Sequence, residues 1–270
     1  MPELPEVETV RRGLAATIVG RRVEGVTVAE HRLRRPLAPA FASALTGRRI
    51  VGVGRRAKYL LLELDDAATW LVHLGMSGTL VVAPADAPVR RHTHVIAVLD
   101  DGRTLRFHDP RRFGLMRVGS RADLAELAAL GLEPLDPAFS AAFLRTTARR
   151  QRRAMKSLLM DQRVVAGLGN IYVNEILFEA GIRPGRRTSR LTRAEAERTV
   201  AATRRVLTEA IAMRGSSIND YRDERGEPGA FQDTFRVYDR AGEPCPRCHA
   251  TIRRRVIIGR SSFYCPQCQS

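Results

Sequence analysis

Apolar residues recur every three or four positions near the start of the chain and at strand-like spacing after it. The first pattern predicts a helix over residues 5–18 that ends at Gly20, with an apolar face made by Val7, Val10, Leu14 and Ile18. Short β-rich segments then alternate with turn signals as far as about residue 119, and we expect strands at 23–28, 59–64, 70–73, 95–99 and 104–107. This half of the chain is therefore predicted to be a β-sandwich or barrel preceded by one helix.

The second half of the chain changes to helical spacing. Helices are expected over residues 139–146, 155–162 and 172–180, and Thr192 with Glu195 forms a capping box that begins a long helix ending near Gly215. Residues 215–232 have no periodicity and predict an exposed, mobile loop. A proline-containing linker is expected at 133–137, between a first domain over 1–132 and a helical domain over 138–235, with a last module over 236–270. The predicted fold class is α+β with several domains.

Composition and charge narrow the class of partner. A hydrophobic content of 44% in 270 residues excludes wholesale disorder and allows a substantial core. The net charge of +16 and the isoelectric point near 11.1 indicate a polyanion, because a basic group placed on a phosphate releases counterions. An anionic membrane surface or a ribosome would also fit the charge. No apolar run of transmembrane length is present, and no long basic amphipathic stretch favours a membrane.

The basic residues are almost all arginine. Of the 45 lysines and arginines only Lys58 and Lys156 are lysines, which leaves 43 arginines. A chain with this bias is expected to use arginine wherever any cation is sufficient, so a retained lysine indicates a need for a compact, titratable ammonium. Chance retention is the alternative for either lysine taken alone.

Four cysteines lie in the last 26 residues and nowhere else, as two C-x-x-C pairs separated by sixteen residues: Cys245, Cys248, Cys265 and Cys268. This spacing is typical of the four-thiolate zinc site of a zinc ribbon. Two disulfides are the alternative, but those belong to secreted chains, and this chain begins without a signal peptide. Four thiolates leave no open coordination position, so we expect one Zn²⁺ with a structural role in a reducing compartment.

The N-terminus could carry a nucleophile. Removal of Met1 would expose the secondary amine of Pro2, and such an amine is partly neutral at physiological pH. Its attack on an aldehyde-like carbon would give a cationic iminium, with Glu3 and Glu6 close by as acid–base groups. An ordinary helix start is the alternative, because proline and glutamate are both favoured in a first helical turn.

Three other segments fit a nucleic-acid partner. Asn170 follows Gly167-Leu168-Gly169 and is placed to cap the next helix, whose free N–H groups can bind a phosphate within reach of Lys156. A tight helical hairpin that binds nothing would have the same signature. Two glycine-flanked loops, 73–78 and 109–114, carry Met76 and Phe113 as large apolar residues beside cations. Such residues can act as wedges in a base stack, although methionine and phenylalanine are more often core.

The histidines give a weaker signal. The motifs His92-Thr93-His94 and His108-Asp109 would allow a metal site, but a histidine pair at strand spacing without a nearby trio of carboxylates is weak evidence for one. We expect His94 or His108 to be structural and His92 to contact a phosphate.

Taken together, these motifs resemble the formamidopyrimidine-DNA glycosylase family, bifunctional base-excision enzymes related to endonuclease VIII. The resemblance extends from Met1 to Gln269. It rests on MPELPEVETVRRGL, RRAKYLLLEL, HLGMSG, HDPRRFG, MDQRVVAGLGNIYVNEILF, VYDRAGEPCPRC and GRSSFYCPQCQ. Leu4 and the set Met76, Arg111 and Phe113 favour the formamidopyrimidine branch over endonuclease VIII.

The resemblance implies catalytic roles. Pro2 would be the Schiff-base nucleophile at C1′ of the damaged nucleotide, Glu3 the general acid–base group and Glu6 its support. Lys58 would assist β-elimination, and Arg260 would contact phosphates and assist δ-elimination. The expected reaction is excision of oxidised purines such as 8-oxoguanine and formamidopyrimidines from duplex DNA, followed by strand cleavage at the abasic site.

The resemblance also implies DNA contacts. Met76, Arg111 and Phe113 would fill the space of the flipped nucleotide, with Arg111 facing the orphaned cytosine. The other backbone contacts would come from His73, His92, Lys156, Asn170 and Tyr238, with Arg152 chosen from the basic run 149–153. The lesion-recognition loop within 215–232 would close over the everted purine through Ser216, Ser217, Ile218, Asn219, Asp220 and Tyr221. The resemblance further implies a helix–two-turn–helix element and a monomer in the bacterial cytoplasm, associated with the nucleoid.

Two positions depart from the family pattern. Asn219 stands where relatives often have a basic residue, and Asp239 replaces the glycine of a more usual Tyr-Gly-Arg. The first leaves lesion preference open, so an endonuclease VIII-type enzyme that prefers oxidised pyrimidines is the runner-up. A non-enzymatic zinc-ribbon DNA-binding protein is the alternative from another class, but it does not explain Pro2, Glu3 and Lys58 together.

Overall fold

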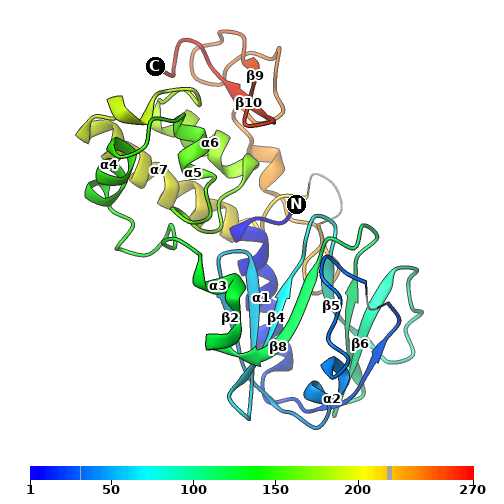
Figure 1. Ribbon diagram of the computed structural model, residues 1–270. Coiled ribbons are helices and arrows are strands. Elements are labelled where there is room, and N and C mark those ends of the chain that lie inside the picture. Colours follow the sequence, from blue (N-terminus) through cyan, green and yellow to red (C-terminus); the bar gives the residue numbers. More distant parts are fainter. Residues whose placement is uncertain (31, 218–220) are drawn as a thin grey trace. The chain divides into compact units, whose positions relative to one another are not determined.

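The computed structural model describes residues 1–30, 32–217 and 221–270, and the chain forms two compact units (Figure 1). The first unit contains Met1–Ala128 and Met213–Gln232, and the second contains Ala129–Ala212 and Asp233–Ser270. The predicted linker at 133–137 thus lies inside the second unit, and most of the predicted loop at 215–232 packs with the first. No helix in the described part of the chain combines the length and the apolar character needed to cross a membrane.

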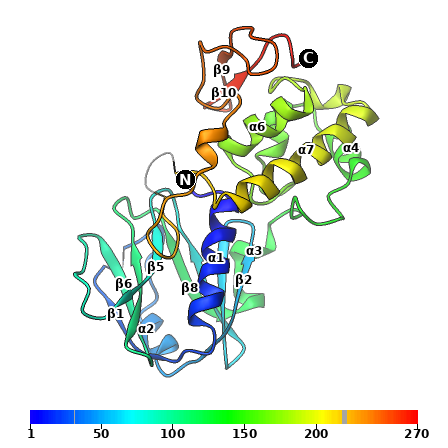
Figure 2. The same cartoon turned by 180° about the vertical axis from the view of Figure 1, so that it is seen from behind.

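The first unit is a β-sandwich of two four-stranded antiparallel sheets with helix α1 (Leu4–Ile18). One sheet has the order β1-β6-β7-β5, and the other has the order β2-β3-β4-β8. Figures 1 and 2 show this unit from opposite sides. The strands are β1 (Val23–Val28), β2 (Ile50–Arg56), β3 (Tyr59–Leu64), β4 (Ala68–His73), β5 (Thr79–Pro84), β6 (Thr93–Leu99), β7 (Arg103–His108) and β8 (Leu115–Ser120). Short helices α2 (Phe41–Leu45), η1 (Arg121–Asp123) and α3 (Ala125–Ala128) complete it.

The core of this unit follows from the alternation of side chains along the strands. Leu60, Leu62 and Leu64 of β3 join the main core with the apolar face of α1, whereas Leu61 joins a second cluster on the opposite face of the same sheet, with Leu71, Leu115 and Leu124. Both faces of β3 are therefore covered. The predicted helix and the five predicted strands are confirmed, with shifts of at most two residues at their ends.

Three strands, β2, β5 and β8, were not among the predicted ones. In β2 the sequence IVGVGRR has glycine at alternate positions, which removes the polar–apolar contrast that would reveal a strand. The edge strand β5 makes one backbone hydrogen bond to a segment far along the sequence, since the Val82 N–H donates to the Glu224 carbonyl at 3.1 Å.

The second unit is helical and ends in a small β hairpin. Its helices are α4 (Ala141–Arg149), α5 (Met155–Leu159), α6 (Asn170–Ala180), η2 (Thr188–Arg190) and α7 (Arg193–Ala212), and its strands are β9 (Arg253–Ile257) and β10 (Arg260–Tyr264). The predicted capping box is present, because Thr192 N–H donates to Glu195 and Glu195 N–H donates to the Thr192 hydroxyl. A separate cluster of Phe178, Val237, Cys245, Ile252, Phe263 and Cys265 forms the core of the last module.

The segment predicted as an exposed loop is partly buried where the structure describes it, and η3 (Phe231–Thr234) is its only regular element there. Ser216, Tyr221, Asp223 and Glu224 have exposed fractions of 6% or less. The prediction of exposure is wrong for these four residues and holds for Arg225 and Glu227. Polar side chains of the segment are used internally, because Asp223 accepts from the backbone N–H groups of Arg225 and Glu227 and pairs with Arg214.

Candidate functional site

Two glutamates at the start of helix α1 each accept a hydrogen bond from the backbone N–H of the other. The side chain of Glu3 accepts from the N–H of Glu6, and the Glu3 N–H donates to Glu6 Oε2 at 2.8 Å, which is a capping box with glutamate at both positions. Pro2, Glu3 and Glu6 are all buried. The predicted nucleophile therefore lies beside the N-terminus of a 15-residue helix, next to two carboxylates.

Glu6 also holds the lesion segment. Its Oε1 accepts from the Ser216 N–H at 2.7 Å and from the Ser216 hydroxyl at 3.1 Å. The Tyr221 hydroxyl donates to the Glu6 carbonyl at 3.3 Å, and burial raises the pKa of Tyr221, as does the nearby Glu6 carboxylate. One carboxylate thus connects Glu3, at the start of the chain, to Ser216. Gly215 permits this approach, because a Cβ there would lie 2.8 Å from Glu6 Oε1 and its φ is +78°.

Lys58 lies in the two-residue turn between β2 and β3 and is 7% exposed. The turn is tied to helix α1 by Arg55, whose Nη1 donates to the Ala57 carbonyl at 2.9 Å while its Nε donates to Glu8 at 3.1 Å. Burial acts to raise the pKa of Glu8, but hydrogen bonds from arginines that include Arg55 lower it overall. Arg55 and Glu8 position the predicted catalytic lysine, and sequence reasoning did not identify either.

His73 is the last residue of β4, and its imidazole is neutral near pH 7. Burial lowers its pKa to about 4, and the positive charges of Lys58 and Arg34 act in the same direction. Its Nδ1 accepts from the Gly75 N–H at 3.0 Å, so Nε2 carries the hydrogen of the neutral ring. His73 is therefore suited to donate a neutral hydrogen bond rather than to attract phosphate by charge.

The two glycine-flanked loops form one platform around Asp109, which is completely buried. Its carboxylate accepts from the Ser77 hydroxyl at 2.8 Å on one loop and from the Gly114 N–H at 2.7 Å on the other. Gly75 lies against the second loop, because a Cβ there would be 2.4 Å from the Phe113 carbonyl carbon, and its φ is +66°. The sequence contained Asp109 within a motif, but nothing in its spacing revealed this contact.

This platform presents the predicted wedge residues at the surface. Phe113 is 44% exposed, Met76 is half-buried, and the guanidinium carbon of the exposed Arg111 lies 4.9 Å from the centre of the Phe113 ring. The interpretation of Phe113 as a core residue is thereby excluded. His94 is structural as predicted, since it is buried with Nε2 at 2.8 Å from the Asp109 carbonyl, whereas His92 is half-buried with φ of +69°.

In the second unit, Asn170 differs from its predicted position. Gly169 is the N-cap of α6, and Asn170 is its first helical residue, with a buried Oδ1 that has no hydrogen-bond partner. Gln162 supports the preceding turn, because its amide donates to the Leu168 carbonyl and accepts from Gly167 N–H, both at 2.8 Å. The predicted turn over Gly167–Gly169 is present, and Asn170, which follows it, has a buried side-chain oxygen without a hydrogen-bond partner.

Lys156 also differs from the prediction. It was expected to reach a phosphate, but it is completely buried, and its Nζ donates to the Ser261 carbonyl at 2.6 Å and to the Ser262 hydroxyl at 2.8 Å. Both acceptors belong to β10, whose first residue is the exposed Arg260. In the basic run, Arg152 is exposed, whereas Arg153 pairs with Asp161 at 3.0 Å.

Helix α6 supports the C-terminal module at two further points. The buried carboxylate of Glu175 accepts from three successive backbone N–H groups, Arg236, Val237 and Tyr238, at 2.8–3.0 Å. Burial raises the pKa of Glu175, although these three hydrogen bonds act against the shift. Asn174 donates to the Asn170 carbonyl at 2.6 Å and accepts from the Phe263 N–H of β10 at 2.8 Å.

These contacts make α6 the support on which the last module is mounted. The Tyr238 ring packs against Phe263 with ring centres 5.3 Å apart. Asp239 has a φ of +59°, a conformation that glycine adopts more easily, which explains why glycine is the more usual residue there.

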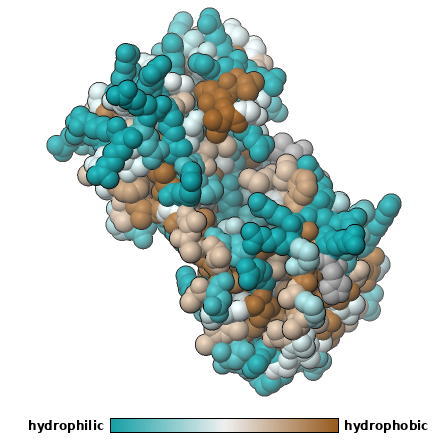
Figure 3. All heavy atoms as spheres, in the orientation of Figure 1, coloured by the Kyte–Doolittle hydropathy of each residue, from teal (hydrophilic) through white to brown (hydrophobic). Residues whose placement is uncertain are grey.

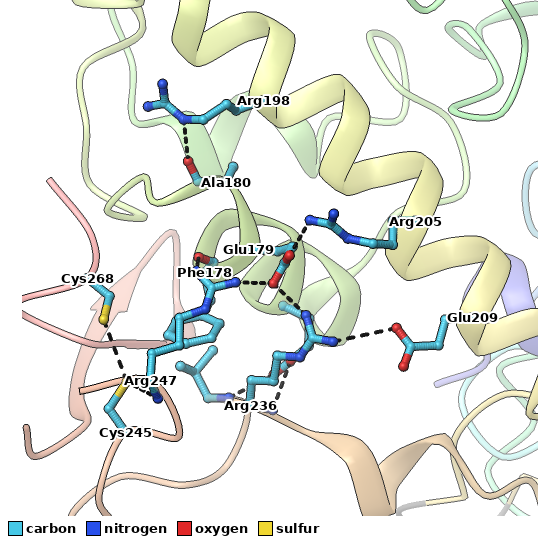
Figure 4. A network of polar contacts seen from close by, with 12 residues as sticks. Phe178, Glu179, Ala180, Arg198, Arg205, Glu209, Arg236, Cys245, Arg247 and Cys268 are labelled. Carbon is cyan, nitrogen blue, oxygen red and sulfur yellow. Dashed lines mark hydrogen bonds and ion pairs between the residues drawn. The ribbon is translucent and has the colours of Figure 1, made fainter. Parts of the chain in front are cut away.

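Glu179 joins the module to the helices through three arginines, as Figure 4 shows. Its carboxylate pairs with Arg205 of α7, with Arg236 and with Arg247, which lies between Cys245 and Cys248. The Arg247 guanidinium carbon also lies 4.5 Å from the centre of the Phe178 ring. The first C-x-x-C pair is therefore held against α6 by an arginine of its own.

The four cysteines fit a tetrahedral zinc ion. Their Sγ atoms all lie within 4.8 Å of one another, with Cys245–Cys268 at 3.8 Å and Cys248–Cys265 at 3.4 Å. A tetrahedron with Zn–S bonds of about 2.3 Å has S···S edges of about 3.8 Å, whereas a disulfide needs about 2.05 Å. The backbone N–H groups of Arg247 and Cys268 donate to Cys245 Sγ and Cys265 Sγ at 3.4 Å and so orient these two sulfur atoms. In the described part of the chain, no other set of three or more His, Cys, Asp or Glu side chains converges in this way.

The predicted site residues fall into two groups. Pro2, Glu3, Glu6, Lys58, His73, Met76, His92, Arg111, Phe113, Ser216, Ser217 and Tyr221 lie in the first unit, and Arg152, Lys156, Asn170, Tyr238, Arg260 and the cysteines lie in the second. Ile218, Asn219 and Asp220 are outside the described residues.

Comparison with known protein families gives three consecutive matches. Residues 1–116 match the formamidopyrimidine-DNA glycosylase N-terminal domain, residues 130–222 its H2TH domain, and residues 242–270 a zinc finger found in FPG and IleRS. Formamidopyrimidine-DNA glycosylases of Thiobacillus denitrificans and Thioalkalivibrio sulfidiphilus are 51% and 50% identical to this chain, with complete coverage of both partners in each comparison.

Solved structures of two members of this family have the same fold as this chain. The MutM (Fpg) protein of Thermus thermophilus has a TM-score of 0.88 and 42% identity, over 99% of this chain and 98% of that chain. The Lactococcus lactis Fpg in complex with DNA containing an abasic site has a TM-score of 0.91 and 34% identity, over 99% of both chains.

Proposed function

This chain belongs to the formamidopyrimidine-DNA glycosylase family, and on that premise we propose how its residues divide the work. It is a DNA glycosylase of base-excision repair that acts on oxidised purines in duplex DNA. The observation that carries the assignment of roles is the glutamate capping box, which holds Glu3 next to Pro2 and links both to Ser216 through Glu6.

Pro2 acts as the nucleophile once Met1 is removed. Its neutral amine bonds to C1′ of the damaged nucleotide while the bond from C1′ to the base breaks, and the base leaves with a proton that Glu3 supplies. The bonded amine then loses its own proton, the bond from C1′ to O4′ breaks as O4′ takes up a proton, and the sugar ring opens to an iminium at C1′. This iminium accepts electrons, so a proton can be lost from C2′ and the 3′ phosphate can leave. Lys58 assists that β-elimination, and Arg260 assists the second elimination, which releases the 5′ phosphate.

Base eversion precedes this chemistry, because the target atom is buried in the duplex. Met76, Arg111 and Phe113 fill the vacated space, and their exposure on the Asp109 platform supports that role. His73, His92, Arg152, Asn170 and Tyr238 contact the DNA backbone. The lesion segment from Ser216 to Tyr221 encloses the everted base.

The four cysteines hold one Zn²⁺, which supplies no catalytic chemistry but fixes the geometry of the hairpin that carries Arg260. The enzyme acts as a monomer in the bacterial cytoplasm, in association with the nucleoid.

Borohydride trapping tests the proposed chemistry. The enzyme is incubated with duplex that contains 8-oxoguanine opposite cytosine, reduced with borohydride, and the N-terminal peptide of the adduct is identified by mass. We expect an adduct on Pro2 in the wild type and none in Pro2→Gly. A folded wild type that gives no adduct, or a Pro2→Gly variant that gives an undiminished one, would refute the Schiff-base mechanism and favour a non-enzymatic DNA-binding protein. Much faster cleavage of oxidised pyrimidines would favour the endonuclease VIII type.

A further inference from the structure

The segment that follows α7 contains a buried carboxylate, Glu224, with an unsatisfied oxygen. Glu224 is 2% exposed, whereas hydrophilic side chains are widespread on the surface in Figure 3. Its Oε1 lies 3.3 Å from Arg225 Nε and 3.7 Å from Arg214 Nη2, but its Oε2 has no hydrogen-bond partner among the described residues. A buried polar atom without a partner lowers stability, so its retention indicates that the side chain is needed where it lies.

The Glu224 carboxylate lies directly against Gly13, in the interior of helix α1. A Cβ at Gly13 would be 1.8 Å from Glu224 Cδ and 2.2 Å from each of the two carboxylate oxygens. Alanine forms helices more readily than glycine, so a glycine inside this 15-residue helix lowers its stability. The carboxylate explains the glycine, because it takes the space that a side chain at this position would fill.

Helix α1 and the returning segment are joined by two contacts of this kind, each between a glutamate and a glycine. Glu6 of α1 lies against Gly215, and Glu224 lies against Gly13. Glu6 and Gly13 are seven positions apart, which is about two helical turns, so both contacts use one face of α1. Figure 2 shows the segment beside α1 and β5, where the Glu224 carbonyl accepts from the Val82 N–H.

The two contacts flank the lesion segment along the chain. Glu6 binds Ser216 and the Tyr221 hydroxyl, and Glu224 follows Tyr221 by three residues. The turn around Glu224 is held in place, because the completely buried Asp223 accepts from two backbone N–H groups of that turn at 2.8 and 2.9 Å. The position of Glu224 on α1 therefore determines where the lesion segment ends, relative to the acid–base groups at the start of the same helix.

We propose that Gly13 and Glu224 are a positioning pair for base excision. The glycine admits the carboxylate, and their contact fixes the lesion segment relative to Glu3, the group that protonates the leaving base. Both residues act through the lesion segment and not on the reacting atoms. The proposal rests on the function proposed above and adds two residues that control the rate of base excision. Strand cleavage at a preformed abasic site needs no base to be enclosed, so it does not depend on this pair.

The test compares Gly13→Ala with Gly25→Ala, a matched control in the first unit because a Cβ at Gly25 would meet nothing within 4 Å. Two single-turnover rates are measured: release of 8-oxoguanine from a duplex in which it lies opposite cytosine, and strand cleavage of a duplex with a preformed abasic site. We expect Gly13→Ala to slow base release roughly tenfold, because a displaced lesion segment aligns the base less well, and to leave abasic cleavage unchanged. Gly25→Ala should leave both rates unchanged.

A loss of folding predicts a different result for Gly13→Ala. Alanine favours the helix, and the Glu224 carboxylate is the end of a flexible side chain that can turn away, so the denaturant midpoint should not fall. Glu224→Ala removes the contact without adding an atom, so it should slow base release in the same way, and it gives the same comparison if Gly13→Ala does not fold. Glu224→Gln keeps the shape of the side chain over Gly13 and should retain most of the rate.

The double variant Gly13→Ala/Glu224→Ala shows whether the two residues act together. All three variants lack the same contact, so the double variant should be no slower than either single one. Multiplied losses would overturn the proposal, as would an unchanged rate of base release in Gly13→Ala, an equal loss of both activities, or a Glu224→Gln variant as slow as Glu224→Ala. Failure of the proposed function is distinguishable, because the wild type itself would then release no 8-oxoguanine and form no Pro2 adduct.

Discussion

Replacing Lys156 by methionine tests how the β9–β10 hairpin, which carries Arg260, is held against the helices of the second unit. Methionine has a similar length and no polar group, so the change removes the bonds from Nζ to the Ser261 carbonyl and to the Ser262 hydroxyl while filling most of the same volume. Arg204→Met is the matched control, because Arg204 is an exposed cation on α7 of the same unit.

The magnitude follows from two short hydrogen bonds to a buried cation. Each hydrogen bond to a charged group contributes about 1.5–3 kcal/mol to stability. Methionine, unlike the ammonium, has no charge to desolvate on burial, and this saving offsets part of the lost hydrogen-bond energy. We therefore expect the hairpin to lose about 2–4 kcal/mol of docking free energy. Arg260 begins the strand that Lys156 holds, so δ-elimination should slow on the order of tenfold or more.

The assay separates the strand-cleavage products from an abasic duplex by their 3′ ends. Lys156→Met should accumulate the β-elimination product, form the Pro2 adduct normally and retain zinc, whereas Arg204→Met should resemble the wild type. A wild-type ratio of the two products would refute the positioning role. If Lys156 instead binds a phosphate, affinity should fall, and the salt slope should decrease by about 0.9 with the product ratio unchanged.

Four further predictions concern other parts of the molecule. Lys58→Arg keeps the charge but loses the titratable ammonium, so strand cleavage should slow with DNA affinity unchanged; an unaltered cleavage rate would remove the argument for lysine. Cys248→Ser should lose zinc and DNA binding together, as measured by metal content and anisotropy. Normal DNA binding by this variant would show that the zinc ribbon over residues 236–270 does not contribute to DNA affinity. Gly75→Ala should destabilise the first unit by about 3 kcal/mol or more in denaturant, because both its φ of +66° and the neighbouring backbone oppose a Cβ, whereas Gly102→Ala, with φ of +78° and open space, should lose only about 1 kcal/mol. Because the pKa of His73 is about 4 in the folded state and 6.5 ordinarily, the unfolded state binds more protons between these values, so the free energy of unfolding should fall by about 2 kcal/mol as the pH decreases from 6.5 to 4; an NMR titration midpoint near 6.5 would contradict this.

Local patterns predicted much of the fold, and long-range contacts account for what they did not predict. The helix over 4–18 and strand 59–64 have periodic apolar positions, whereas β2 has glycine at alternate positions and was not found. Contiguous motifs likewise revealed the candidate catalytic residues and the cysteines. The Glu6–Ser216 contact joins residues 210 positions apart, and no spacing rule connects them.

Lys156 is a second case in which the sequence does not predict a long-range contact. Its retention in an arginine-rich chain predicts a special requirement, and the structure pairs its ammonium with a backbone carbonyl 105 positions away and with the hydroxyl of Ser262. A sequence can show that a cation is unusual, whereas only the packing shows what the cation binds.

The return of residues 213–232 to the first unit has a consequence for synthesis on the ribosome. Residues 1–128 emerge first, but Ser216, which binds Glu6, and Glu224, which binds the edge strand β5, are made about 90 residues later, after the whole α4–α7 region. While the helices are translated, Val82 of β5 lacks this hydrogen-bond partner, and strand edges with free backbone groups favour association between chains. A fragment that ends at residue 128 would preserve that incomplete state permanently, so a separately expressed N-terminal domain should need residues 213–232, supplied by a designed connection, to remain monomeric.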